Sequence, residues 1–510
     1  MATASPPRGE PDAYDLLVVG GGINGTGIAR DAAGRGLSVL LAERGDLAGF
    51  TSSSSTKLIH GGLRYLEYYE FRLVREALAE RERLLRLAPH VIWPLRFVLP
   101  HDEGLRPAWL LRLGLFLYDH LARLRTLPGS ESVNLRRSPV GRPLQDRLTK
   151  GFLYSDCWVE DSRLVVLNAM DATRHGAEVL TRTGVVSARR EGDLWVAHLR
   201  DERTGGERTV RARAVVNAAG PWVSKTLGGT LGVNSRAAVR LIKGSHIVVP
   251  KLFEGDQAYI LQQPDKRIIF AIPYEHDFTL IGTTDVPYEG EPGPVTISPE
   301  ETDYLCSCIN RSFATKIGPA DVVWSYSGVR PLYDDAAANA SAVTRDYVLD
   351  VEDAGGRLPV LSVFGGKITT YRRLAEHALE KLAPYFPHLK PAWTGEGILP
   401  GGDMKDADFD TFLADLRRRR PFLPEELARR LARAYGTRVD DLLGSATSLA
   451  DLGEAFDGGL TAAEVDYLRR NEWAVTAEDI LWRRSKLGLR TGQESAARLE
   501  AYLARRAEAA

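Results

Sequence analysis

The sequence contains very few cysteines. Cys157, Cys306 and Cys308 are the only three in 510 residues. So small and odd a number cannot build the disulfide framework that stabilises small secreted domains, and it favours a reducing compartment. The Cys306-x-Cys308 pair could form half of a metal site, but no second Cys or His pair follows at ligand spacing. We therefore predict buried structural thiols and no metal.

The sequence also lacks an excess of charge of either sign. Lys and Arg total 66, Asp and Glu total 67, and the formal net charge at pH 7 is −1. A balanced chain has no global field that would draw the whole molecule onto nucleic acid or an anionic surface. We expect no nucleic-acid partner, and any charged partner has to meet a local patch.

Long apolar runs are absent as well. No stretch approaches the roughly 18 to 20 uninterrupted apolar residues that a membrane-spanning helix needs, so we expect no span. Residues 106–125 nevertheless place apolar side chains close to helical spacing, with arginines among them. That pattern suits an interfacial helix on a membrane and equally an amphipathic helix packed on a core. The apolar positions are Trp109, Leu110, Leu113, Phe116, Leu117, Leu121 and Leu124, and the arginines are Arg112, Arg123 and Arg125.

What is present is the composition of a globular protein, 44% hydrophobic and 26% charged. At about 150 residues per domain, the length suggests roughly three domains. Residues 14–43 predict a βαβ unit, and the strand-rich residues 241–328 predict a largely antiparallel sheet. A helix is predicted over 162–175, with its acids and amide on an exposed face. Beyond 400–402 the pattern is helical.

A glycine-rich turn follows the first predicted strand. Gly20-x-Gly22-x-x-Gly25 ends that strand and opens a helix, which is the context that a dinucleotide-binding fingerprint requires. The glycines permit a tight turn, close approach of a pyrophosphate and close packing of helix on strand. Glu43 ends the second strand about 20 residues farther on, the spacing expected of an acid that binds ribose hydroxyls. The unit predicts a nucleotide cofactor, either nicotinamide or flavin.

Two later segments favour flavin. The apolar strand 214–217 ends in small residues at Gly220, and Phe364-Gly365-Gly366-Lys367 repeats the strand-to-helix step of the amino end. These separated segments suggest a nucleotide domain that is assembled from distant parts of the chain. A helix that begins near Gly366 would direct N–H donors and a positive dipole end toward the charge on a reduced flavin ring.

From Tyr14 to about Pro400 the sequence resembles the family of FAD-dependent, aerobic respiratory glycerol-3-phosphate dehydrogenases. Residues 472–484 also resemble the helical cap of that family. The matching blocks in the main part are residues 20–25, 51–67, 151–158, 240–249, 281–285, 326–331 and 362–371.

The resemblance implies an α/β fold. It comprises a Rossmann-like FAD-binding domain built from separated segments, an antiparallel-sheet substrate domain and a C-terminal helical domain. The expected boundaries are 14–90, 150–235 and 340–390 for the first, 91–149 and 236–339 for the second, which also faces the membrane, and 391–510 for the third.

The resemblance further implies oxidation of sn-glycerol 3-phosphate to dihydroxyacetone phosphate, with the hydride passing from C2 to flavin N5 and the electrons to membrane quinone. The enzyme would be a homodimer on the inner, cytoplasmic face of the cell membrane. This favours membrane contact for residues 106–125, and the basic run 417–420 is either a headgroup contact or a solvated helix face. The rivals are an oxidase that reduces oxygen to hydrogen peroxide and a flavin-holding scaffold without turnover.

The matching motifs also supply site residues. His246 is the expected base, because histidine titrates near working pH, and Arg330 is either a phosphate ligand or a stabiliser of the developing alkoxide. The expected substrate-binding residues are Arg64, Tyr65, Thr283, Arg330 and Lys367. The expected FAD-binding residues are Gly20, Gly22, Gly25, Glu43, Ser52, Ser54, His60, Gly220, Gly365, Gly366 and Lys367.

Overall fold

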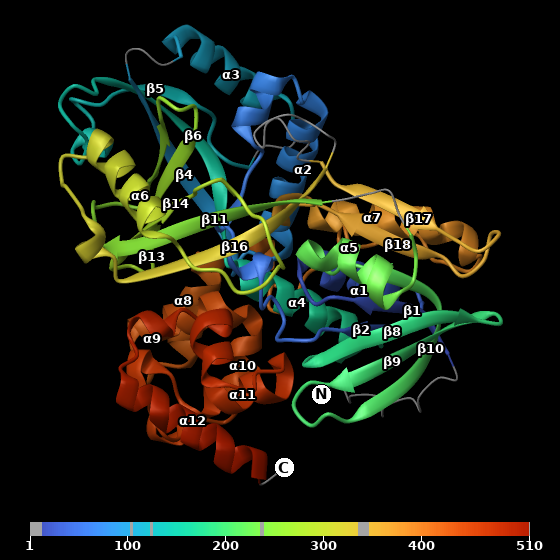
Figure 1. Ribbon diagram of the computed structural model, residues 1–510. Coiled ribbons are helices and arrows are strands. Elements are labelled where there is room, and N and C mark those ends of the chain that lie inside the picture. Colours follow the sequence, from blue (N-terminus) through green and yellow to red (C-terminus); the bar gives the residue numbers. More distant parts are fainter. Residues whose placement is uncertain (1–12, 103–105, 123–125, 235–238, 335–345, 509–510) are drawn as a thin grey trace.

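The structure is a computed structural model that describes residues 13–102, 106–122, 126–234, 239–334 and 346–508. Two β-sheets and a C-terminal group of helices make up the described chain (Figure 1). The predicted fold class is confirmed. The domain boundaries stay predictions. Strands β3 and β6, which fall inside ranges assigned to the FAD-binding domain, pair in the second sheet.

The first sheet contains the predicted βαβ unit. Its central strands are parallel, so their carboxyl ends, at Val19, Asn217 and Phe364, lie at one edge of the sheet. Helices α1 (Ile23–Gly34), α4 (Asp161–Arg174) and α7 (Tyr371–Leu382) pack together on one face. The strands are, in order across the sheet, β17 (Val348–Glu352), β18 (Val360–Phe364), β10 (Glu207–Asn217), β1 (Tyr14–Val19), β2 (Val39–Ala42) and β7 (Glu178–Leu180), with β8 (Thr183–Glu191) and β9 (Leu194–Asp201) joined through β10.

The second sheet is antiparallel except where β12 pairs with β4. One face packs under α2 (Phe71–Leu87) and α3 (Ala108–His120), and the other packs against α6 (Pro299–Ser312). The strands are β3 (Leu58–Ile59), β4 (Ile92–His101), β5 (Glu131–Asn134), β6 (Lys150–Val159), β11 (Val239–Pro250), β12 (Ala258–Gln262), β13 (Ile268–Tyr274), β14 (Phe278–Gly282), β15 (Val286–Pro287) and β16 (Trp324–Tyr333).

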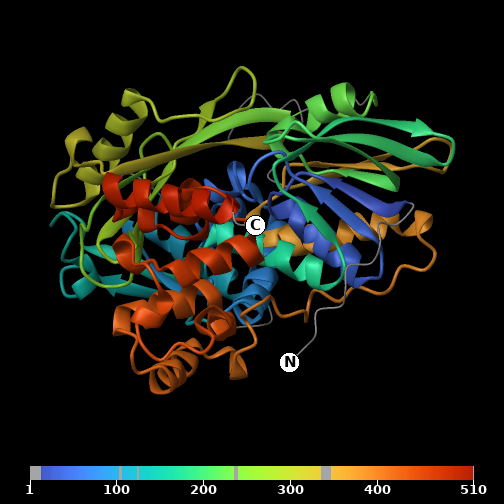
Figure 2. The ribbon, with the colours of Figure 1, turned by 90° about the horizontal axis from the view of Figure 1, so that it is seen from below.

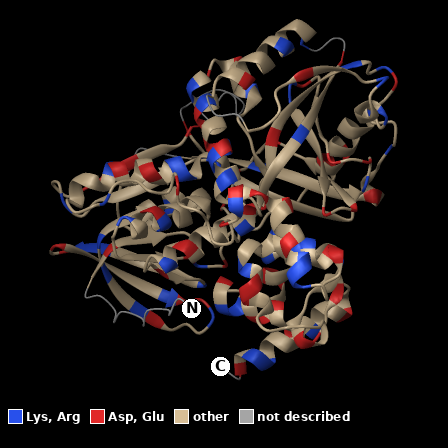
Figure 3. Ribbon diagram, turned by 180° about the vertical axis from the view of Figure 1, so that it is seen from behind, with Lys and Arg blue, Asp and Glu red and all other residues tan. Residues whose placement is uncertain are grey.

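The C-terminal helices have a core of their own and lie beside both sheets (Figure 2). Acidic and basic residues are interspersed along them (Figure 3). Arg417 and Arg419 pair with Glu425 and Asp440, so these two charges of the basic run have acidic partners within the C-terminal helices, and both alternatives for the run stay predictions. The helices are α8 (Phe409–Arg419), α9 (Glu425–Tyr435), α10 (Val439–Leu443), α11 (Ala462–Glu472) and α12 (Gln493–Glu508), with a short π-helix at Asp479–Arg484.

Helix α4 corrects one prediction. Its acids and amide were expected on an exposed face, but the helix is buried almost throughout. Asp171 pairs with Arg30 at 2.7 Å, and the Asn168 side chain donates a hydrogen bond to the Tyr371 hydroxyl at 3.0 Å. Polar residues at helical spacing indicated solvent, whereas here they meet buried partners from α1 and α7.

Helix α3 leaves much of its apolar face in solvent. Trp109 is 68% exposed and Phe116 is 49% exposed, whereas Leu115 and Tyr118 face the second sheet. In Figure 3 the helix lies at the top and is nearly free of charge. The other side of the helix packs on the core of the second sheet, so both alternatives for this segment stay open, while Arg123, Leu124 and Arg125 lie outside the described residues. Within those residues, no helix combines the length and apolar character needed to cross a membrane.

Candidate active site

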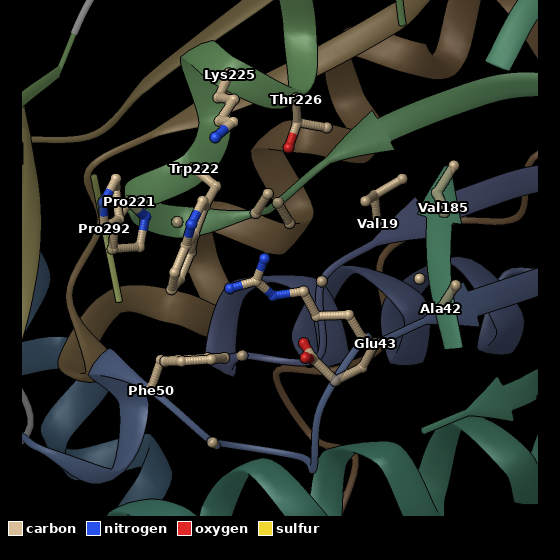
Figure 4. Close-up of a pocket in the computed structure, with 18 of the residues that line it drawn as sticks. Val19, Ala42, Glu43, Phe50, Val185, Pro221, Trp222, Lys225, Thr226 and Pro292 are labelled. Carbon is tan, nitrogen blue, oxygen red and sulfur yellow. The ribbon is translucent and has the colours of Figure 1, made fainter. Parts of the chain in front are cut away.

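A cavity of about 450 Å³ opens at the carboxyl edge of the first sheet. It is lined by residues from four separate parts of the chain, within 19–52, 184–202, 218–230 and 291–292, including Gly20, Gly22, Glu43, Gly220 and Trp222. Figure 4 shows Glu43 and Phe50 on one side and Trp222 with Lys225 on the other. Five of the predicted cofactor residues, Gly20, Gly22, Glu43, Ser52 and Gly220, thus surround one cavity, as expected for a ligand at this edge of a parallel sheet.

The glycines of the fingerprint allow a close approach of backbone to backbone. Gly20 has φ +111°, a conformation open to glycine. A Cβ added to Gly25 would lie 1.9 Å from the Gly20 carbonyl oxygen, so helix α1 could not pack so closely on β1 with any other residue there. The amino end of α1 thus begins beside Gly22 in the cavity wall, where a helix terminus favours an anion.

Glu43 is held in place by two backbone donors. The Gly21 N–H donates to Oε2 at 2.6 Å, and the Gly45 N–H donates to Oε1 at 2.7 Å. Burial raises the pKa of Glu43, although these two N–H groups oppose that shift. Each carboxylate oxygen keeps lone pairs for further acceptance, as binding of ribose hydroxyls requires.

Ser52, Gly365 and Gly366 meet at the start of α1. The Ile23 N–H donates to Ser52 Oγ at 3.0 Å, and the Asn24 side-chain amide donates to the Gly365 carbonyl at 3.1 Å. A Cβ on Gly366 would lie 2.8 Å from that amide. The Gly365–Gly366 turn is thereby placed against the glycine-rich loop, although the two lie far apart in sequence.

Three further residues at the cavity were not foreseen. The Arg44 guanidinium lies 4.4 Å from the centre of the Trp222 ring and 5.4 Å from that of Phe50. The two rings pack edge to face at 4.7 Å. Arg44 follows Glu43 directly, so its position beside the predicted acid was an available signal. Phe50 and Trp222 come from distant segments of the chain, so no feature of the sequence indicated that their rings would meet.

His246 is the buried centre of a second cluster. It lies on β11, where its Nε2 is 3.0 Å from Thr56 Oγ1 and its ring stacks on Tyr326 at 4.7 Å. Nδ1 has no hydrogen-bond partner in the described part of the chain. Burial, followed by the positive charges of Lys57 and Arg330, holds the pKa of His246 well below its usual range. The ring is therefore neutral at pH 7, and the same surroundings make it a weaker proton acceptor than an exposed histidine.

Arg330 and Thr283 lie beside this histidine. A Cβ on Gly244 would come within 2.8 Å of Arg330 Nη2 and 2.9 Å of Thr283 Oγ1, so both side chains occupy the space that this glycine leaves. Arg330 forms an ion pair with Asp285 and donates to the Thr284 carbonyl at 3.1 Å. The structure thus brings the two predicted residues together, and it adds an acid partner that sequence reasoning missed.

Lys367, Tyr65 and His60 form a neighbouring group. Lys367 Nζ is 3.8 Å from the centre of the Tyr65 ring, and the His60 N–H donates to Thr369 Oγ1 at 3.2 Å. Burial, with further contributions from Lys367 and Arg81, lowers the pKa of His60. The Nε of Arg64 is buried and unpartnered within the described residues, which leaves a donor for a ligand.

A buried ion pair supports the His246 cluster. Lys57 is fully buried and lies 2.8 Å from Asp161 Oδ1, and its ammonium is 5.1 Å from the centre of the Tyr326 ring. Ser54, a predicted flavin contact, packs against Gly328 on the same strand as Tyr326. Lys57 falls inside the matching block 51–67, but nothing in the sequence paired it with Asp161.

The fold and the cavity define a dinucleotide-binding protein of the Rossmann type. The model of the FAD dependent oxidoreductase family matches residues 15–372, and the chain belongs to this family. A second model, the C-terminal domain of alpha-glycerophosphate oxidase, matches residues 392–508. The protein is an FAD-dependent oxidoreductase, and the glycine-lined helix end, the tethered acid and the cavity fit that cofactor.

Named relatives extend over nearly the whole chain. A glycerol-3-phosphate dehydrogenase of Pseudomonas aeruginosa is 57% identical over 502 residues, covering 98% of this chain and 96% of that protein. A D-erythritol 1-phosphate dehydrogenase of Brucella abortus is 56% identical over 477 residues, covering 94% and 95%. The X-ray structure of the glycerol-3-phosphate dehydrogenase from Bacillus halodurans with FAD has a TM-score of 0.75 at 27% identity and covers 97% of this chain and 94% of that one. The predicted family is confirmed.

Proposed function

We propose that the protein oxidises sn-glycerol 3-phosphate to dihydroxyacetone phosphate and delivers the electrons to a membrane quinone. The observation that carries this proposal is the neutral, buried His246 beside Arg330 and Thr283 in an FAD-dependent oxidoreductase. The names of the Pseudomonas aeruginosa and Bacillus halodurans relatives support the substrate.

The cationic residues suit a phosphoester. A phosphate dianion needs several fixed donors, and arginine and lysine supply them with different geometry. We assign Lys367 and Arg64 to the phosphate, with Tyr65 held against Lys367 by the cation–π contact. Arg64 keeps a buried unpartnered Nε within the described residues, as a donor reserved for a ligand would.

His246 acts as the base in this proposal. Thr56 fixes one ring nitrogen and Tyr326 fixes the ring plane, so the imidazole is oriented before substrate binds. The depressed pKa keeps the ring neutral, and it takes the proton of the C2 hydroxyl. FAD, when bound, supplies the acceptor for the hydride lost from C2. Arg330, oriented by Asp285, stabilises the negative charge that develops on the C2 oxygen.

Anaerobic mixing with glycerol 3-phosphate tests the substrate. We expect the flavin absorbance at about 450 nm to bleach with glycerol 3-phosphate and to stay unchanged with glycerol. D-erythritol 1-phosphate is the second candidate, because the Brucella abortus relative is nearly as similar as the Pseudomonas aeruginosa one. Faster bleaching by the four-carbon phosphoester would move the assignment to it. If neither compound bleaches the flavin, the proposal is wrong and the scaffold alternative stands.

Reoxidation of the bleached protein tests the acceptor. We expect a soluble quinone analogue to restore the absorbance much faster than air-saturated buffer does. Rapid recovery in air with release of hydrogen peroxide would instead identify an oxidase.

The membrane surface is the third part of the proposal. The exposed apolar side chains of α3, with Tyr69 of the preceding segment at 81% exposure, form a patch suited to the lipid interface. We place this patch on the inner face of the cell membrane, where it would bring the protein to its quinone. A homodimer remains a prediction, and light scattering of the purified protein tests it.

A further inference from the structure

A buried carboxylate lies on the loop that forms one wall of the FAD cavity. Asp46 follows Glu43 by three residues and is 5% exposed. Ala48, Gly49 and Phe50 of the same loop line the cavity together with Glu43 (Figure 4). The contacts of Asp46 therefore bear on the shape of the cofactor site, although Asp46 is not among the cavity-lining residues.

Two arginines of the C-terminal helical group hold this carboxylate. Arg484 makes a bidentate contact, with Nη1 2.7 Å from Oδ2 and Nη2 2.7 Å from Oδ1 of Asp46. Arg483 Nε lies 2.6 Å from Oδ2. The Arg484 side chain is fully buried, so these are charge-assisted bonds shielded from water.

The same arginines are fixed within their own unit. Arg484 Nε donates to the Glu472 carbonyl at 3.0 Å, and Arg483 also pairs with Asp479 at 2.5 Å. Burial opposes ionisation of Asp479, but the backbone N–H groups of Thr476 and Val475 and the adjacent arginines lower its pKa to about 2. A charged Asp479 thus keeps Arg483 in place at any ordinary pH.

Backbone hydrogen bonds connect the loop that carries Asp46 to the residues expected to bind the cofactor. The Ala48 N–H donates to the Gly21 carbonyl at 3.1 Å, and Gly21 and Gly45 each donate to the Glu43 carboxylate. From the other side, the Arg182 N–H donates to the Gly45 carbonyl at 2.7 Å. Movement of Asp46 would therefore move the Glu43 carboxylate and the glycine turn together.

We propose that the C-terminal helical group controls FAD affinity, with Arg483 and Arg484 as positioning residues that act through Asp46 on the 43–50 loop. FAD binding and docking of the C-terminal helices are then coupled, and by linkage each stabilises the other. This inference concerns retention of the cofactor and does not depend on which phosphoester the protein oxidises.

Two substitutions break the contact with little change of shape. Asp46→Asn removes the charge, and Arg484→Lys removes the bidentate geometry while keeping the charge. Asp277→Asn is the control, because Asp277 pairs with Arg490 of the same C-terminal group but lies in the turn between β13 and β14, away from the cavity. FAD titration of the apoprotein, followed by fluorescence, should show the Kd rising by about ten-fold or more in the first two variants, the size expected for a lost charge-assisted hydrogen bond. The control should stay within about two-fold of the unmodified chain.

Hydrogen exchange of the unmodified chain supplies the second readout. We expect amides of 476–487 to exchange more slowly with FAD bound than in the apoprotein, although these residues do not line the cavity. This arm decides the proposal even if a variant fails to fold. An unchanged Kd in both variants, or equal exchange of 476–487 with and without FAD, would show that the cluster is only a buried junction and would overturn the proposal.

Discussion

His246 combines burial, a single hydrogen bond and two nearby positive charges. Truncation of a base lowers the rate of flavin reduction, whereas truncation of a binding residue lowers the affinity for substrate. For His246→Ala we expect the rate of flavin reduction to fall about 10²- to 10⁴-fold, the usual contribution of a positioned base, while substrate affinity changes little. Anaerobic stopped-flow at several substrate concentrations separates the two quantities.

The control for this experiment is His198→Ala, because His198 is exposed on β9, where its ring hydrogen-bonds Thr209. It should leave both quantities unchanged. A loss of affinity at an unaltered limiting rate for His246→Ala would contradict the base assignment.

His90 links pH to stability. It is fully buried, and burial, followed by the charges of Arg163 and Arg433, lowers its pKa to about 3. Below about pH 6.5 the unfolded chain binds a proton here that the folded chain does not, so stability falls as pH falls toward the folded pKa. His90→Gln should flatten the decline of the unfolding free energy between pH 6 and pH 4 by about 1.4 kcal/mol per pH unit.

Urea unfolding at several pH values measures that slope. His198→Gln is again a suitable control, since its ring is exposed. If the slope for His90→Gln equals that of the unmodified chain, the pKa of His90 does not differ between the folded and unfolded states, and the prediction is wrong.

The βαβ element depends on a glycine that no other residue can replace. Gly25→Ala would place a methyl group 1.9 Å from the Gly20 carbonyl oxygen, and the helix would have to move away from β1. We expect a loss of about 3 kcal/mol or more in unfolding free energy, together with a loss of bound FAD. Gly114→Ala in α3 meets nothing within 4 Å and should be neutral or stabilise by about 0.5 to 1 kcal/mol. Urea midpoints and flavin content of the two variants make the comparison, and equal stability would contradict it.

The sequence predicted secondary-structure elements and motifs better than it predicted which side chains contact one another. Strand, glycines and acid at residues 14–43 follow local rules, so the nucleotide half of the site was readable. Helix α4 was placed within a residue of its observed bounds, yet its environment was wrong because burial depends on what packs against a helix. Lys57 with Asp161, and Arg44 with Trp222, are joined only by the tertiary fold, which leaves no periodic signal in sequence.

For the whole molecule, the proposed membrane contact through the exposed face of α3 can be tested with lipid vesicles. With a net charge of −1, attachment should come from apolar burial and should persist at high salt, where the Debye length falls to about 3 Å at 1 M. The double variant Trp109→Ser, Phe116→Ser should lose co-sedimentation with phosphatidylcholine–phosphatidylglycerol vesicles. Leu449→Ser, which removes a leucine that is 46% exposed on the C-terminal helices, is the matched control and should bind normally. Binding abolished by salt but unaffected by the double substitution would contradict the assignment to α3.

The order of strands in the first sheet constrains when that sheet can form during synthesis of the chain. Strand β1 is complete at Val19, but its neighbour β10 ends at Asn217, and the next strand, β18, begins only at Val360. Strand β1 can pair with β2 early in synthesis, but its other edge has no partner until β10 has been translated, and β10 in turn lacks β18 until residue 364. Because Arg484 is synthesised after every strand of the first sheet, the contact between the C-terminal group and Asp46 can form only once the strands of that sheet have been made.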